Sequence, residues 1–344
     1  MVEIRILTKF VAQIITTTMI IESMKTRVVG VGISLAKTTC AIVDLRGNII
    51  ASASFPTGDY PIISDFVGAL CETILNMVEA NGGYDSIRSV GISAPSGNFQ
   101  TGSIVNSPNM PWKGIVPLAA MLRDQLGIAV ALANNAHVMA LAEHTFGAAH
   151  GMRDFIVISM GGGVGSSLFS KGQLHLGTDG FAGEFGHSCI IDEGRTCGCG
   201  NKGCVEAYCS WKGIVTTAKE ILAESDKPSL MRDDPQLEAN HIVDYCNQGD
   251  ELAQETYRRT GELLGIGLAN YASVIDPEAI IFTELAAYAG KWLLEPAYES
   301  FNNHVFRNIK EKVKFIPSTM DSHQRHILGA SVLAWEVKEY SLFK

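Results

Sequence analysis

Three cysteines and one histidine lie close together in the sequence and could bind a metal ion. Cys197, Cys199 and Cys204 follow His187 within the segment GEFGHSCIIDEGRTCGCGNKGCVE, residues 183–206. Three thiolates and one imidazole supply the four ligands that a closed, tetrahedral structural zinc site requires. The glycines between the cysteines allow tight turns, because glycine adopts positive φ angles without steric cost. The pattern therefore predicts a structural zinc bound by these four residues.

The alternative is a glycine-rich loop with free thiols in a reducing compartment. The chain has eight cysteines, and the five outside the cluster are scattered through apolar segments. Scattered cysteines in a chain of this size are typical of buried thiols in the cytosol rather than of a disulfide framework. The spacing favours the metal site. Because Glu184 and Glu206 flank the cluster, a loop held by metal would form one wall of a binding site.

Length and composition indicate a soluble, globular protein. The 344 residues are enough for two domains. A composition of 47% hydrophobic and 18% charged residues excludes a disordered chain. The net charge of −9 and the lack of a basic stripe argue against nucleic-acid binding. The apolar stretch 10–21 is too short to span a membrane and lacks a signal-peptide cleavage site. We expect a cytoplasmic protein whose residues 1–27 form a weakly ordered extension, with Met24 as an alternative start.

Two segments each predict a β-meander whose first bend is rich in small residues. Residues 27–55 have the pattern strand, bend, strand, hairpin turn, strand, and residues 154–177 repeat it. Alternating helical and buried-strand patterns follow both segments. This organisation predicts an α/β protein built from two similar domains with a cleft between them.

Backbone N–H groups in such bends can bind phosphate groups. A nucleotide-dependent sugar kinase is therefore the first functional hypothesis. Glycine also occurs in the turns of any meander, so the bends by themselves are equally typical of an ordinary β-structure.

Five segments resemble the ROK family of repressors, uncharacterised frames and kinases. They are GEFGH at 183–187, CGCGNKGCVE at 197–206, the glycine bend at 161–165, SPNMPW at 107–112 and IDPEAII at 275–281. They follow the family's order over nearly the whole chain. The resemblance, which includes glucokinases and N-acetylhexosamine kinases of bacteria, implies an α/β, two-lobed, actin-like (ribonuclease-H-like) fold with an interdomain cleft.

The resemblance also implies a division into lobes. We expect residues 28–132 and 325–344 to form the small N-terminal lobe, and residues 133–324 to form the large lobe that binds sugar and zinc. It further implies a homodimer, and Mg-ATP as the cosubstrate of an active kinase.

Five polar residues would contact the sugar if the resemblance holds. They are Asn109, Asn134, Glu184, His187 and Glu206. Hydrogen bonds between charged side chains and sugar hydroxyls are worth about 1.5–3 kcal/mol each. His187 can bind zinc through one nitrogen and donate from the other, so both roles are compatible. For Glu184 the alternative is a solvated acid in a turn.

Two acids of the family's kinases are absent here. The kinases have ENDAN, whose aspartate accepts the proton of the attacking hydroxyl, whereas this chain has ANNAH with Asn135 at that position. An amide cannot serve as a base near neutral pH, and general-base catalysis contributes about 10²–10⁴-fold in rate. Gly32 replaces the acid of the family's DIGGTK bend that helps to hold magnesium. We expect His137 to be a packed or capping histidine, because it lies on a different helix face from Asn135.

Of the other segments that face the nucleotide in the family, one is retained here and one is changed. The family has a glycine run after a buried strand where this chain has Glu284 and Leu285, and Glu284 would bring negative charge towards a nucleotide. Lys37 is a candidate phosphate contact or else a solvated lysine. One phosphate-binding bend is retained, and its candidate residues are Gly161, Gly162, Gly163 and Gly165.

The favoured hypothesis is a sugar-binding protein of hexose-kinase descent, with phosphoryl transfer lost or weak and a sensor or regulatory role. The alternative is an ATP-dependent hexose or N-acetylhexosamine kinase, since phosphoryl transfer depends mainly on positioning and electrostatics. A sugar-responsive DNA-binding repressor is the third hypothesis, but the 27 residues before Val28 are too few for a helix-turn-helix domain. The expected partner is a small sugar, and neither nucleic acid nor a membrane.

Overall fold

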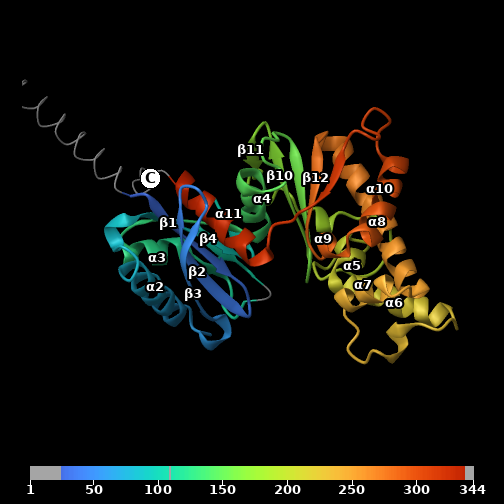
Figure 1. The fold of residues 1–344 in the computed structure, drawn as a ribbon, viewed down its shortest axis with the longest axis horizontal. Coiled ribbons are helices and arrows are strands. Elements are labelled where there is room, and N and C mark those ends of the chain that lie inside the picture. The colour runs from blue at the N-terminus through green and yellow to red at the C-terminus, as the bar shows by residue number, and fades with distance from the viewer. Residues whose placement is uncertain (1–24, 108–109, 338–344) are drawn as a thin grey trace, which may run out of the picture. The chain divides into compact units, whose positions relative to one another are not determined.

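The computed structural model describes residues 25–107 and 110–337, which divide into two compact units (Figure 1). Unit 1 takes its described residues from the ranges Met1–Ala142 and His323–Lys344, and unit 2 is Glu143–Ser322. The expected extension, apart from its last residues, and Asn109 lie outside the described residues. Within those residues, no helix has both the length and the apolar character needed to cross a membrane.

Unit 1 is built on a five-stranded sheet in the order β3-β2-β1-β4-β8. The first three strands form the antiparallel meander that the sequence predicts, and β4 and β8 continue the sheet in parallel with β1. Side chains of β1 and β4 are almost all buried, as expected for central strands covered on both faces. The strands are β1 (Arg27–Ile33), β2 (Lys37–Asp44), β3 (Ile49–Pro56), β4 (Ile87–Ala94) and β8 (Ala129–Asn134).

Helices cover this sheet, and glycines let one of them approach closely. A Cβ at Gly30 would lie 2.5 Å from the carbonyl oxygen of Ile327, and one at Gly91 would lie 1.9 Å from that of Ala330. The last helix therefore packs with its backbone directly on β1 and β4. The helices are α2 (Ile63–Glu79), α3 (Leu118–Leu126), α4 (Asn135–Phe146) and α11 (Ser322–Glu336), with short 3-10 turns at Thr57–Asp59 and Tyr84–Ser86. A small sheet adds β5 (Gly97–Asn98), β6 (Ser103–Val105) and β7 (Ile115–Val116).

Unit 2 repeats the sheet of unit 1. Its strand order is β11-β10-β9-β12-β13, again with an antiparallel meander followed by two parallel strands. The duplication that the two sequence segments predict is therefore present in the fold. The strands are β9 (Phe155–Met160), β10 (Val164–Ser170), β11 (Gln173–His175), β12 (Ala279–Glu284) and β13 (Lys314–Pro317).

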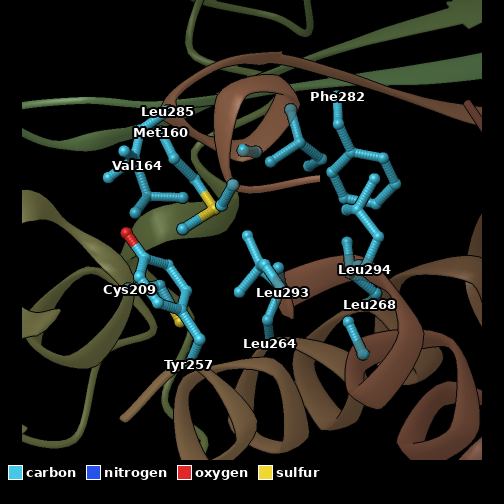
Figure 2. Close-up of a cluster of buried hydrophobic side chains, with 14 of the residues drawn as sticks. Met160, Val164, Cys209, Tyr257, Leu264, Leu268, Phe282, Leu285, Leu293 and Leu294 are labelled. Atoms are coloured by element: carbon cyan, nitrogen blue, oxygen red, sulfur yellow. The ribbon is translucent and has the colours of Figure 1, made fainter. Parts of the chain in front are cut away.

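The helices of unit 2 bury a large apolar core against this sheet. Figure 2 shows Met160 and Phe282 of the sheet facing Leu264 and Leu268 of α8 and Leu293 of α10. The 25-residue helix α8 is preceded by its N-cap Asp250, whose carboxylate accepts hydrogen bonds from N–H groups of the first turn. The helices are α5 (Glu206–Cys209), α6 (Trp211–Glu224), α7 (Ala239–Asn247), α8 (Glu251–Ile275), α9 (Leu285–Ala289) and α10 (Lys291–His304), with 3-10 turns at Phe185–His187 and Leu230–Asp233.

Candidate functional site

The structure brings the four predicted metal ligands together in unit 2. The ligand atoms of His187, Cys197, Cys199 and Cys204 all lie within 4.8 Å of one another. The Sγ atoms of Cys199 and Cys204 are 3.8 Å apart, and Cys197 Sγ is 3.7 Å from His187 Nδ1. A tetrahedral zinc with ordinary bond lengths would place two thiolates about 3.8 Å apart and a thiolate and an imidazole nitrogen about 3.6 Å apart. The four residues therefore fit a zinc-sized tetrahedral ion.

The protonation of the thiols depends on such an ion. Burial raises the pKa of Cys204 and of Cys197, whereas the backbone N–H of Asn201 lowers the pKa of Cys199. Two of the thiols would thus stay protonated at neutral pH without a cation beside them. A bound cation would deprotonate them, because the thiolate is the ligand form.

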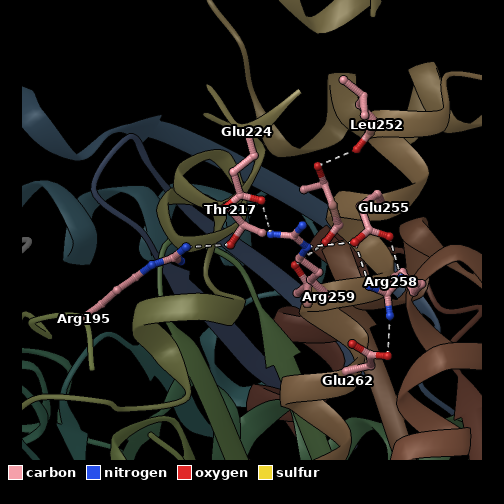
Figure 3. Close-up of polar contacts among 10 residues, drawn as sticks. Arg195, Thr217, Glu224, Leu252, Glu255, Arg258, Arg259 and Glu262 are labelled. Atoms are coloured by element: carbon pink, nitrogen blue, oxygen red, sulfur yellow. Dashed lines mark hydrogen bonds and ion pairs between the residues drawn. The ribbon is translucent and has the colours of Figure 1, made fainter. Parts of the chain in front are cut away.

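A second set of contacts holds the cysteine loop, and it does not involve the cluster. The guanidinium of Arg195 donates to Thr217 Oγ1 at 3.0 Å (Figure 3). The same guanidinium donates to the carbonyl oxygens of Ala207 and Gly213 at 3.3 and 3.1 Å. It also stacks on the ring of Tyr208, 4.6 Å from the ring centre. Arg195 therefore fastens the loop to α5 and α6.

His187 faces the cluster with one nitrogen and an acid with the other. Its Nδ1 points to Cys197, whereas its Nε2 lies 3.9 Å from Glu184 Oε2. The side chains of His187 and Glu184 are 36% and 55% exposed, so a ligand can reach both. This arrangement suits hydroxyl groups, because carboxylate oxygens accept from them and an imidazole can donate or accept.

Glu206 joins the cysteine loop to the glycine bend. Its Oε2 accepts a hydrogen bond from the backbone N–H of Val164 at 3.0 Å, and its Oε1 lies 3.7 Å from Cys197 Sγ. A Cβ at Gly163 would lie 2.5 Å from Glu206 Oε2, so only glycine allows the carboxylate this close. The sequence gives no indication of this contact, because it depends on how α5 packs beside β10.

The glycine bend is held from both sides, and its residue Gly162 lines one of two cavities in unit 2. The N–H of Gly161 donates to the carbonyl of Gly163, and the N–H of Trp211 donates to the carbonyl of Gly161, each at 2.9 Å. A cavity of about 750 Å³ lies between α6, the start of α7 and α9, and Trp211, Leu237 and Leu285 are among its apolar lining residues. A second cavity of about 440 Å³ is lined by Gly162 of the bend and by residues of the cysteine loop and α6. Both volumes are in the usual range of small-molecule sites.

Glu284 keeps the backbone conformation of a glycine. Its φ and ψ are 56° and −131°, a region that non-glycine residues rarely adopt. Its carboxylate accepts from Ser322 Oγ at 2.9 and 2.8 Å. The charge that we expect to face a nucleotide is thus bound to a hydroxyl at the start of α11.

The remaining predicted residues belong to unit 1. Asn134 accepts from the N–H of Ala136 at 2.8 Å and so caps α4, and Asn135 Oδ1 accepts from Ser93 Oγ at 2.8 Å. Lys37 is exposed at the start of β2. His137 is only 4% exposed, which agrees with a packed histidine.

The sequence interpretation missed Ser93, His326 and Arg195. Ser93 stands near the carboxyl end of a predicted buried strand, where α/β proteins often place polar site residues, and this signal was available. His326, whose Nδ1 lies 3.1 Å from Ser93 Oγ, has no local signal because its partner is far along the chain. Arg195 has none because several of its partners are backbone atoms.

Comparison with known proteins places the chain in a family. The sequence profile of the ROK family matches residues 28–337. The chain belongs to the ROK family. The glucokinase of Streptomyces coelicolor is 30% identical over 315 residues, which are 90% of this chain and 97% of the relative.

Solved ROK structures have the same fold. A glucokinase from Streptomyces griseus in complex with glucose and AMPPNP has a TM-score of 0.74 and 28% identity, over 90% of this chain and 100% of that one. A ROK transcriptional regulator, a homologue of the E. coli MLC protein, has a TM-score of 0.80 at 23% identity, over 89% and 77% of the two chains. The α/β, actin-like fold class and the family are thereby confirmed.

Proposed function

We propose that this ROK protein binds a hexose in the cytoplasm and transfers phosphate to it slowly or not at all, acting as a sensor or regulator. The observation that carries the proposal is the side chain at position 135, an amide whose Oδ1 accepts from Ser93. An amide cannot take up the proton of an attacking hydroxyl. By contrast, Glu184 and His187 remain exposed beside the cysteine cluster and can bind hydroxyl groups.

The proposal assigns zinc a structural role. His187, Cys197, Cys199 and Cys204 would hold the ion, whose part is to fix the loop that carries the sugar-binding side chains. Glu184, His187 and Glu206 would then contact the sugar, with Asn134 and Asn109 as further contacts implied by the family. The retained bend Gly161–Gly165 and Lys37 would contact phosphate only if nucleotide binds. A homodimer also belongs to this proposal.

Two measurements on the purified chain test the proposal. A thermal-shift screen with glucose, N-acetylglucosamine, N-acetylmannosamine, allose and fructose should show stabilisation by at least one sugar, because a ligand stabilises the state that it binds. A coupled assay with Mg-ATP and the same sugars should show turnover well below about 1 s⁻¹, the low end of ordinary enzymes. The absence of any sugar shift contradicts hexose binding, and turnover above that value contradicts weakened transfer.

A second candidate is an ATP-dependent hexose or N-acetylhexosamine kinase. The cavity of about 750 Å³ supports it, because Trp211 in its lining is hydrogen-bonded to the glycine bend and its apolar walls could accept a purine ring. The similarity to two bacterial glucokinases also supports this second candidate.

Restoring the family's two acids discriminates the candidates. If transfer is limited by the missing acids, Asn135→Asp combined with Gly32→Asp should raise turnover by about 10²–10⁴-fold, the usual contribution of a general base. A Cβ at Gly32 would lie 3.5 Å from His326 Cβ, an ordinary contact, so the residue can be accommodated. No gain in turnover would favour the second candidate, in which other groups already perform these roles.

A further inference from the structure

Two cysteines at the base of the cysteine loop lie opposite each other on paired backbone segments. Cys189 and Cys204 form an isolated antiparallel β-bridge. The residue after each cysteine donates its N–H to the carbonyl oxygen of the residue before the other one, at 2.8 and 3.0 Å. These two hydrogen bonds flank the cysteines, which therefore occupy a non-hydrogen-bonded position of the pair, where opposite side chains approach most closely.

The backbone spacing at this position suits a disulfide. The Cα atoms of a non-hydrogen-bonded antiparallel pair are about 4.5 Å apart, and disulfides join Cα atoms that are about 4.4–6.8 Å apart. The segments touch at Gly203, where a Cβ would lie 1.7 Å from the carbonyl oxygen of Ile191 and 3.1 Å from Cys189 Sγ. The thiol of Cys189 donates to that carbonyl of Ile191 at 3.5 Å. Disulfide formation therefore requires a rotation of the Cys189 side chain toward Cys204.

The two thiols differ in access and in role. The sequence predicts buried thiols outside the cluster, and four of those five cysteines are buried, whereas Cys189 is exposed. Cys189 is also not among the four ligands, and Cys204 is a ligand that is 0% exposed. Cys199 is exposed as well, but its sulfur belongs to the metal site. Because oxidation of a thiol requires access, Cys189 is the non-ligand sulfur that an oxidant in solution can reach.

We propose that hydrogen peroxide oxidises Cys189, and that a disulfide between Cys189 and Cys204 then opens the metal site. The inference rests on the zinc site of the proposed function and does not require a sugar. The sulfur of Cys189 attacks one oxygen of the peroxide, the O–O bond breaks, and water leaves behind a sulfenic acid. The thiolate of Cys204 attacks that sulfur, the S–S bond forms and the S–O bond breaks. The departing hydroxide takes a proton from solvent, so two electrons from the two sulfurs have reduced the peroxide to two waters.

The disulfide removes one of four ligands. His187, Cys197 and Cys199 remain, which is one ligand short of a closed structural zinc site, so the loop should release the ion. The loop stays attached to the protein, because the hydrogen bonds of Arg195 to α5 and α6 do not involve the cluster. A thiol such as glutathione can reduce the disulfide by exchange and so restore the site.

The test treats the purified, zinc-loaded full-length chain with hydrogen peroxide and follows zinc release with a colorimetric zinc indicator. Peptide mapping without reductant should find Cys189 joined to Cys204, with two fewer reactive thiols than the eight of the reduced chain. Reduction with glutathione in the presence of added zinc should restore the metal content.

Variants separate the role of Cys189 from general oxidation. Cys189→Ser should contain zinc when reduced, and should release it about 10-fold more slowly under peroxide, because the oxidant must then attack thiolates that bind the metal. Cys71→Ala is the control, since it removes a buried thiol of unit 1, and it should release zinc as fast as the parent.

The inference and the proposed function fail in different ways. If the reduced protein holds no zinc, the zinc site of the proposed function is overturned, and the release step with it. If zinc is present but Cys189→Ser releases it as fast as the parent, only the inference is overturned. The same holds if the mapping finds Cys199 joined to Cys204, whose Sγ atoms are 3.8 Å apart, instead of Cys189.

Discussion

The carboxylate of Glu206 accepts a hydrogen bond from the backbone N–H of Val164, at 3.0 Å. One residue therefore connects the loop that carries the metal ligands with the bend that carries Gly161 and Gly163. The close approach requires a glycine at 163, where a Cβ would lie 2.5 Å from Glu206 Oε2. Changes at position 206 should consequently affect both segments.

We predict that Glu206→Ala lowers the free energy of unfolding by about 1–3 kcal/mol, because it removes a charged acceptor from a half-buried backbone N–H. Glu206→Gln should cost less, since its amide oxygen can still accept from Val164. Urea denaturation measures both values. Glu193→Gln is the control, because that exposed acid pairs with exposed Lys202 on the same loop. Equal costs for the alanine and glutamine variants would contradict the role of this hydrogen bond.

Metal removal should destabilise unit 2. We expect about one zinc per chain by elemental analysis, and a lower melting temperature after treatment with a chelator, because ligand binding free energy contributes to folding. Cys199→Ser should lose the metal. Cys189→Ser is the matched control, since Cys189 is an exposed, free cysteine close to the cluster but not among its four ligands. Full zinc content in Cys199→Ser would show that these thiols are not the ligands.

The backbone at Glu284 predicts an unusual order of stabilities. Both Glu284→Gly and Glu284→Ala lose the hydrogen bonds to Ser322, but only glycine adopts φ 56° and ψ −131° without strain. Glu284→Gly should therefore be more stable than Glu284→Ala by about 1–3 kcal/mol. Chemical denaturation compares the two variants. The reverse order would mean that position 284 does not hold this conformation in solution.

An ion-pair network on α8 predicts a loss of stability in acid. Glu255 accepts hydrogen bonds from Arg258 at 2.6 and 2.7 Å and from Arg259 at 2.8 Å, and these neighbours, Arg258 first, lower its pKa to about 2 (Figure 3). Because the folded-state pKa is below the ordinary value of 4.5, the stabilisation is present above about pH 4.5 and disappears as the pH falls through about 2.

Glu255→Gln should therefore lower the free energy of unfolding at pH 7, by less than about 1 kcal/mol because exposed pairs are screened by solvent. The difference from the parent should shrink between pH 4.5 and pH 2 and also in high salt. Urea denaturation at several pH values measures it, with exposed Glu72→Gln on α2 as the control. A difference that stays constant down to pH 2 would contradict the ion-pair explanation.

Several features could be predicted from the sequence because they depend on neighbours along the chain. The four metal ligands lie between residues 187 and 204, so that a single glycine-rich loop brings their atoms within 4.8 Å. The two meanders follow from the alternation of apolar runs and turns, and the strand order confirms them. The family motifs are local in the same sense, and the match of the family model to residues 28–337 confirms the family that they indicate. The roles of the expected sugar contacts and the identity of the ion stay predictions.

Other features were decided only by the tertiary structure. Ser93 and His326 are 233 residues apart, and they meet because glycines in β1 and β4 let α11 pack directly on the sheet. His137, the histidine nearest to Asn135 in the sequence, is instead buried in the core. The contact between Glu206 and Val164 likewise depends on the approach of a carboxylate to a backbone N–H that is 42 residues away in the sequence. The sequence alone determined which side chains lie on each loop and strand. Long-range packing determined which of these side chains face one another. The physical reason is that the distance to which two backbones can approach decides which side chains of separate elements come into contact.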